Sequence, residues 1–241
     1  QAVDDALRKT FNFGDPILLP EAPIELNFLD WLISPAYAGE SRSALDADAV
    51  KRLNRWIPQR SELEEFLPLA HKALNEAANS TLKKKPLEER YHQLFRQATL
   101  ATAWQESCWR QFVNKGGKRL PMTSPSGSLG IMQVNPRVWR GFYDINALKS
   151  DFIYNAQAGS EILMHYLLDI AIKKGEHTKT GNADNLARAS YSAYNAGPGK
   201  LTRYRDGKAS SREKRVDQDF WKKYQAMKKN DPLAVLACYG G

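Results

Sequence analysis

One long apolar helical pattern constrains the fold of this chain most strongly. It runs from Pro86 to about Val113. Its apolar and small residues fill two adjacent stripes of the expected helix: Tyr91, Phe95, Thr99, Thr102, Glu106, Trp109 and Val113 on one, and Leu94, Ala98, Ala101, Gln105, Cys108 and Phe112 on the next. A helix that is apolar over so wide an arc is surrounded by protein. The sequence therefore predicts a mainly α protein built around a central, buried helix.

Glu106 lies in the least charged part of that helix. Between residues 98 and 109 the only other ionisable side chain is Cys108. Burial disfavours the charged form of a carboxyl group and raises its pKa, which suits a general acid near neutral pH. The alternative is a buried structural glutamate that pairs with an arginine such as Arg96 or Arg110.

Proline and helical spacing divide the chain into two parts. Four prolines make residues 10–43 an irregular arm that contains one short apolar segment, IELNFLDWLI. Helical spacing returns over residues 44–56 and again over residues 58–79. The run Lys83–Pro86 then indicates a loop before the central helix. We therefore expect an N-terminal irregular and helical arm over residues 1–85.

The net charge of +8 is unevenly distributed along the 241 residues. Residues 1–80 hold 8 Lys+Arg against 13 Asp+Glu, residues 81–199 hold 16 against 9, and residues 200–241 hold 11 against 5. A basic surface attracts polyanions such as nucleic acid, anionic membranes and anionic cell-wall polymers. The basic stretch over residues 200–229 fits such a surface, and it fits a loop followed by a solvated helix face equally well.

Several other classes of protein find no support in the sequence. No run approaches the roughly 18 apolar residues that span a bilayer. No phosphate-binding glycine loop follows a strand, and no nucleophile elbow occurs. The histidines are isolated, without the spacing of metal ligands, at His71, His92, His165 and His177. We therefore expect neither a metal nor a cofactor.

Three further segments follow Glu106. They are SPSGSLGIMQVNP at 124–136, NAQAGSEIL at 155–163 and ASYSAYNAGPG at 189–199. Each alone has a structural reading. The first is a turn-rich loop in which Gly127 and Gly130 permit close backbone approach. The second is a helix with a closely packed glycine, Gly159, and the third is a helix that ends at a Gly-Pro-Gly turn.

Taken together and in order, these segments resemble the catalytic domain of the soluble lytic transglycosylase family, which shares a lysozyme-like fold with goose-type lysozyme. The resemblance rests on ES at 106–107, SPSGSLGIMQ at 124–133, the N-x-x-x-G-x-x-x-L pattern at 155–163 and AYNAGPG at 193–199. It covers roughly residues 90–205. The stretch between the first two motifs is longer than in other members of the family. Asn135 stands two residues after the glutamine, where some members carry methionine.

The resemblance implies a lysozyme-like helical catalytic domain over residues 86–241, with a basic C-terminal segment. Its reaction would be cleavage of the β-1,4 bond between N-acetylmuramic acid and N-acetylglucosamine in peptidoglycan. Its partners would be glycan strands and further proteins of the cell envelope, and no nucleic acid is expected. The localisation would be the bacterial envelope, in the periplasm. The chain begins QAVDD without a leader, so we expect a mature product whose targeting segment has been removed.

The same resemblance assigns roles to individual residues. Glu106 would be the single acid and base. Ser124 and Gln133 would contact the sugar. Tyr194 would form a hydrogen bond near the acid, Asn195 would hold the turn that follows, and both would take part in substrate binding.

A single carboxyl group agrees with the chemistry that the resemblance implies. Ordinary glycosidases use two carboxylates, whereas the other acids of this region lie in ordinary amphipathic segments, at Asp144, Asp151, Glu161 and Asp169. Glu106 would protonate the leaving oxygen while the substrate's N-acetyl group stabilises the cation-like centre. Glu106 would then take the proton from the C6 hydroxyl as that oxygen closes on C1. The product is a 1,6-anhydro sugar formed without water.

Two other functions stay open at this point. One is a hydrolytic muramidase of the goose-lysozyme type on the same fold. The other is a non-catalytic module that binds the cell wall or another polyanion through the basic surface.

The last expectation concerns the pairing of the two cysteines, Cys108 and Cys238. Cys108 lies two residues after Glu106, about 200° around a helix, and would point away from the cleft. Cys238 lies in the apolar tail PLAVLACYGG. Since paired thiols are commonly bridged in an oxidising envelope compartment, we expect a disulfide that holds the tail behind the catalytic helix. The alternative is two buried free thiols.

Overall fold

A computed structural model describes residues 45–239 of the chain. This part is mainly helical and contains one two-stranded sheet. The helices are α3 (Ala47–Leu53), α4 (Leu63–Lys84), α5 (His92–Ser107), α6 (Ile145–Ser150), α7 (Phe152–Met164), α8 (Glu176–Thr180), α9 (Asn185–Ala196) and α10 (Ser211–Lys228). The arm expected over residues 10–43 lies outside the described residues. In residues 45–239, no helix combines the length and apolar character needed to cross a bilayer.

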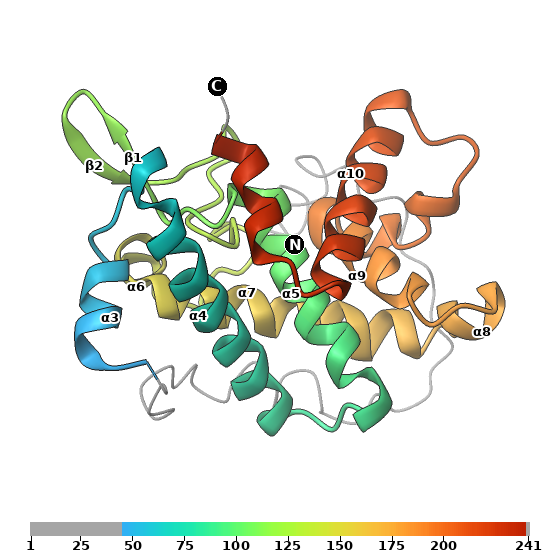
Figure 1. Cartoon of the computed structure of the whole chain (residues 1–241). Helices are drawn as coiled ribbons and strands as arrows, with labels where there is room; N and C mark the ends of the chain where they lie inside the picture. Colours follow the sequence, from blue (N-terminus) through green and yellow to red (C-terminus); the bar gives the residue numbers. More distant parts are fainter. Residues whose placement is uncertain (1–44, 240–241) are drawn as a thin grey trace.

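Short turns of other helical types connect these elements. The 3-10 turns are η1 (Arg60–Glu62), η2 (Glu89–Tyr91), η4 (Pro198–Lys200), η5 (Arg203–Arg205) and η6 (Pro232–Tyr239). The segment η3 (His165–Ile172) is a π-helix that continues α7 without a break. The combined helix crosses behind α4 and α5 in Figure 1.

Helix α5 lies in the middle of the helical body, with α4, α7, α9 and α10 packed around it (Figure 1). All eight residues from Gln97 to Trp104 are buried. Two full turns of helix present every face, so burial of all eight shows that protein surrounds α5. The central, buried helix predicted from the sequence is therefore confirmed.

The predicted length of this helix is wrong at both ends. Helix α5 begins at His92 and ends at Ser107, because Cys108 and Trp109 adopt left-handed backbone angles, with φ of 54° and 60°. Trp109 is nonetheless fully buried, and its Nε1 donates a 3.0 Å hydrogen bond to the carbonyl oxygen of Leu100. The apolar spacing continued past Ser107 because Trp109 is buried without being helical.

The basic segment after α5, which contains Gly116 and Gly117, forms a β-hairpin. Strand β1 (Phe112–Lys115) pairs antiparallel with β2 (Lys118–Pro121). Gly116 and Gly117 both have positive φ, as a two-residue hairpin turn of this kind requires. The hairpin projects from the edge of the helical body (Figure 1).

Helix α4 extends five residues beyond the predicted end at Asn79 and includes two lysines expected in a loop. Tertiary contacts account for the extension. The hydroxyls of Thr81 and Ser160 on α7 lie 3.0 Å apart, and the Lys84 ammonium lies 3.4 Å from the Glu161 carboxylate. Helix α4 packs against α5 and α7 in one apolar core, and the domain boundary at residue 85 stays a prediction.

Candidate active site

Glu106 occupies the last turn of α5, where its half-buried side chain meets a cleft of about 620 Å³. The other walls come from the segment 124–142, from α7 and η3, from the end of α9 and from the start of α10. Among the described residues that line this cleft, Glu106 is the only one with a carboxyl group.

The loop opposite Glu106 is held by amide and hydroxyl side chains. Gln111 Oε1 accepts a hydrogen bond from the backbone N–H of Ile131, and Asn155 Oδ1 accepts one from Met132, both at 2.9 Å. The Ser107 hydroxyl lies 2.6 Å from the carbonyl oxygen of Ile131. The side chains of Ser107, Gln111 and Asn155 therefore tie this loop to the end of α5 and to α7.

Two glycines make this close packing possible. A Cβ at Gly130 would lie 2.4 Å from both Asn155 Nδ2 and Gln111 Oε1, and one at Gly159 would lie 2.2 Å from Met132. The close approach expected at Gly130 and Gly159 is confirmed. The same expectation is wrong for Gly127, which has open space around it and supplies only a positive φ of 86°.

Two side chains of α9 act on the acid. The Tyr191 hydroxyl donates a 3.0 Å hydrogen bond to Glu106 Oε1, and Asn195 lines the same cleft. Burial raises the pKa of Glu106 above its ordinary value, while hydrogen bonding by Tyr191 and Asn195 and the charges of Lys223 and Arg203 oppose the rise. The surroundings of Glu106 therefore stabilise both its protonated form and its charged form.

Tyr194 lies near the acid, as expected, but does not bond it. Its hydroxyl donates a 2.6 Å hydrogen bond to the carbonyl oxygen of Met132, and Tyr191 is the residue that bonds Glu106. On a helix, residues three and four apart lie on one face, so the repeated tyrosine in ASYSAYN was the signal for Tyr191. Asn195, expected to hold the turn, accepts a 3.0 Å hydrogen bond from Arg203 Nη1.

The structure brings all of the predicted sugar-contacting residues to the cleft. The Ser124 hydroxyl accepts from the backbone N–H of Ser128, and Gln133 Nε2 donates to the carbonyl oxygens of Met122 and Gly130. These bonds fix where the two side chains stand in the cleft wall. Their contact with a sugar stays a prediction, as it does for Tyr194 and Asn195.

The cleft also has an aromatic wall that the sequence did not reveal. Trp139 contacts Phe142, His165 and Tyr166 edge to face, with ring centroids 6.1 to 6.4 Å apart. Aromatic faces of this kind pack well against the apolar faces of sugar rings. These residues come from separate segments, so only the folded chain brings them together.

The other candidate carboxylates have structural partners elsewhere. Asp144 and Asp151 accept hydrogen bonds from backbone N–H groups at the starts of α6 and α7. Glu161 bonds Gln157 and lies against Lys84, and Asp169 pairs with His165 and Lys173. The arginines proposed as alternative partners of Glu106 are also engaged: Arg96 bonds Asn79, and Arg110 bonds the carbonyl oxygen of Ser107.

A disulfide joins Cys108 and Cys238, the pair expected from the sequence. Cys108 is the left-handed residue that ends α5, so it reaches the tail from the helix end and not from a helical face. The bridge holds η6, which packs against α4 and α10 (Figure 1). The Tyr239 hydroxyl adds a 2.7 Å hydrogen bond to the carbonyl oxygen of Cys108.

Metal chemistry has no candidate centre in the part of the chain that the structure covers. Residues 45–239 contain no group of three or more histidine, cysteine or acidic side chains placed to hold a metal ion.

The central helix, its single cleft carboxyl and the helices around them define a lysozyme-like helical domain. A family model described as the transglycosylase SLT domain matches residues 88–217, more than half of the chain. The chain belongs to this family, whose activity is the lytic cleavage of peptidoglycan. Neither the search of curated proteins nor the search of solved structures found a significant match.

Proposed function

We propose that this protein is a lytic transglycosylase that cleaves the β-1,4 bond between N-acetylmuramic acid and N-acetylglucosamine and leaves a 1,6-anhydro sugar. The observation that carries the proposal is the single carboxyl group in the cleft, Glu106. A hydrolase with two catalytic carboxylates needs a second one about 5–9.5 Å away, on the other side of the bond. The acids nearest in sequence to the cleft segments have structural partners instead.

The surroundings of Glu106 suit a group that acts first as an acid and then as a base. Burial favours its protonated form, which donates the proton to the leaving oxygen. After that transfer, the Tyr191 hydroxyl and the Asn195 amide stabilise the carboxylate. The carboxylate then takes the proton of the C6 hydroxyl, whose oxygen forms the new bond to C1.

The cell envelope is the compartment that fits this function, and we place the protein in the periplasm. The Cys108–Cys238 disulfide supports an oxidising compartment. The substrate is the glycan strand of peptidoglycan, and proteins of the envelope are candidate partners.

Mass spectrometry of purified peptidoglycan digested by the protein tests the proposal. A transglycosylase releases muropeptides that lack one water relative to the hydrolytic product. Muropeptides with a free reducing end would identify a muramidase of the goose-lysozyme type instead. Intact peptidoglycan that sediments with the protein would identify a wall-binding module.

A further inference from the structure

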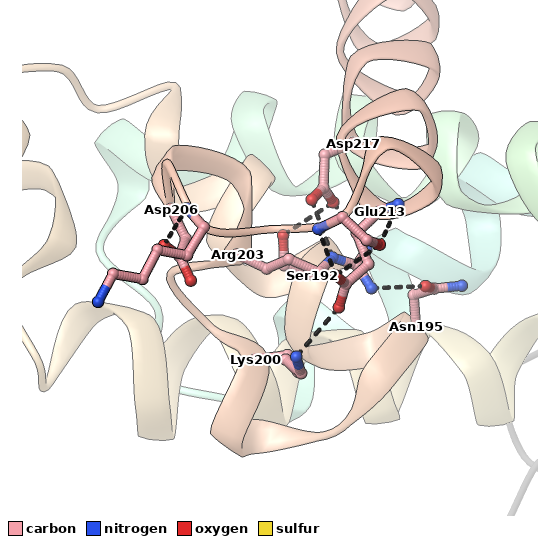
Figure 2. Close-up of polar contacts among 9 residues, drawn as sticks. Ser192, Asn195, Lys200, Arg203, Asp206, Glu213 and Asp217 are labelled. Carbon is pink, nitrogen blue, oxygen red and sulfur yellow. Dashed lines mark hydrogen bonds and ion pairs between the residues drawn. The ribbon is translucent and has the colours of Figure 1, made fainter.

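A chain of polar contacts connects Asn195 to a buried ion pair (Figure 2). Arg203 of η5 and Asp217 of α10 have side chains that are each 4% exposed, and they meet in a two-pronged contact of 2.8 and 2.7 Å. The Ser192 hydroxyl donates to the same carboxylate at 3.0 Å. The third contact of the guanidinium goes from Nη1 to Asn195 Oδ1.

This third contact determines the orientation of the Asn195 carboxamide. A carboxamide has an acceptor at one end and two donors at the other, whereas a guanidinium can only donate. Because Arg203 donates to it, the oxygen end faces Arg203 and the NH2 end faces away, as Figure 2 shows. Asn195 is exposed at the cleft, so its own burial would not prevent the amide from turning over.

The orientation matters because the two ends of the amide act on Glu106 in opposite ways. The NH2 group donates to a carboxylate and stabilises the charged form of the acid. A reversed amide would present its oxygen to Glu106, which favours the protonated form and opposes the base step.

We propose that Arg203 is a positioning residue for catalysis: fixed by Asp217, its guanidinium holds the Asn195 carboxamide with the NH2 group toward Glu106. Arg203 itself does not touch the reacting atoms and acts through Asn195. The inference rests on the proposed role of Glu106, but its test does not require cleavage activity.

Other charged or titratable groups also surround Glu106 and need to be separated from this effect. Tyr191 and Tyr194 lie on α9 and Lys223 on α10, while His165 and Arg212 line the cleft. The Arg203 charge also acts on Glu106 directly. The Arg203→Lys variant retains that charge but loses the planar guanidinium, which donates hydrogen bonds to Asp217 and Asn195 at the same time.

The experiment measures the pKa of Glu106 by carboxyl-carbon NMR in four proteins: wild type, Arg203→Lys, Asn195→Ala and the double variant. We expect each single variant to raise the pKa of Glu106 by about one unit, which is a tenfold change in proton affinity. The double variant should match Asn195→Ala alone, because Arg203 acts through that amide. The alkaline limit of kcat/KM should move up in parallel.

Lys200→Met is the matched control. Lys200 carries a positive charge in the same neighbourhood and pairs with Glu213, but it has no bond to Asn195 (Figure 2). The pKa of Glu106 should be unchanged in this variant. A wild-type pKa in Arg203→Lys, or equal shifts from Arg203→Lys with and without Asn195, would overturn the proposal.

A measurement on the wild type covers the case in which Arg203→Lys does not fold. The side-chain NH2 signals of Asn195 should titrate with the pKa of Glu106, because the proposal turns that end of the amide toward the carboxyl group. Signals that do not respond to ionisation of Glu106 would show that the amide is not held in this orientation. An inactive protein whose NH2 signals follow Glu106 would instead point to failure of the proposed function.

Discussion

The hydroxyl of Tyr191 donates a 3.0 Å hydrogen bond to Oε1 of Glu106, across the contact between α9 and α5. Tyr191 is buried, and its ring stacks on Phe220 with centroids 4.1 Å apart. The phenol therefore has little freedom to leave the carboxyl group. This contact stabilises the charged form of an acid whose pKa is raised by burial.

The first prediction concerns the loss of that hydroxyl. Tyr191→Phe should raise the pKa of Glu106 and lower kcat about tenfold, since a hydrogen bond to a charged group contributes about 1.5–3 kcal/mol. The alkaline limit of kcat/KM should move to higher pH. Tyr194→Phe is the control: its hydroxyl bonds the carbonyl oxygen of Met132, so this limit should not move. The reverse pattern would show that the roles of the two tyrosines are interchanged.

The second prediction concerns stability and pH. The folded-state pKa of Glu106 is raised, so its carboxyl stabilises the fold below the unfolded pKa of about 4.3, and this contribution is lost as the pH rises toward the folded value. Glutamine does not titrate. The free energy of unfolding of Glu106→Gln, relative to wild type, should therefore increase with pH across this window. Urea titrations between about pH 4 and pH 8 measure the difference, and a difference that falls with pH would contradict the raised pKa.

The glycines of the cleft loop give the third prediction. Gly130→Ala should destabilise the fold by more than about 3 kcal/mol, because its Cβ would overlap Asn155 and Gln111 and the residue has a positive φ. Gly127→Ala has the same backbone restriction in open space and should cost only about 1–2 kcal/mol. Thermal unfolding of both variants measures the gap. Equal losses would mean that packing at Gly130 is not as close as described.

The fourth prediction concerns the disulfide. Cys108 and Cys238 are 130 residues apart, and removal of the bridge in Cys108→Ser/Cys238→Ser should cost about 2–4 kcal/mol. Reductant should lower the urea midpoint of the wild type and leave that of the double variant unchanged. A count of two free thiols in unfolded wild type without reductant would show that the bridge does not form.

The sequence predicted the structure best in two respects: the burial of the central helix, from its apolar spacing, and the meeting of the motif segments. The eight buried residues of α5 produced a pattern that only a surrounded helix explains, and Glu106 was found because it interrupts that pattern. The motif segments around Gln133, Asn155 and Asn195 predicted which parts of the chain meet. The end of α5 was missed because Trp109 is buried in left-handed backbone, and spacing cannot distinguish burial from helix.

Contacts between distant segments account for what the sequence did not predict. The Tyr191 bond to Glu106 depends on how α9 turns against α5. The segment ASYSAYN offers two tyrosines, and the sequence alone does not specify which of them reaches the acid. The Arg203–Asp217 pair joins residues of a stretch that the sequence predicted to be either a basic surface or a loop with a solvated helix face. The burial of this pair became visible only with the fold.

The most direct test of Glu106 as the single acid and base is the rate at which Glu106→Gln releases anhydro-muropeptides from purified peptidoglycan. The amide retains the shape of the side chain but cannot transfer the proton, so the rate should fall by at least about 10²-fold. Circular dichroism of Glu106→Gln should show the same helical content as that of the wild type. Release at a rate close to that of the wild type would contradict the assignment of Glu106.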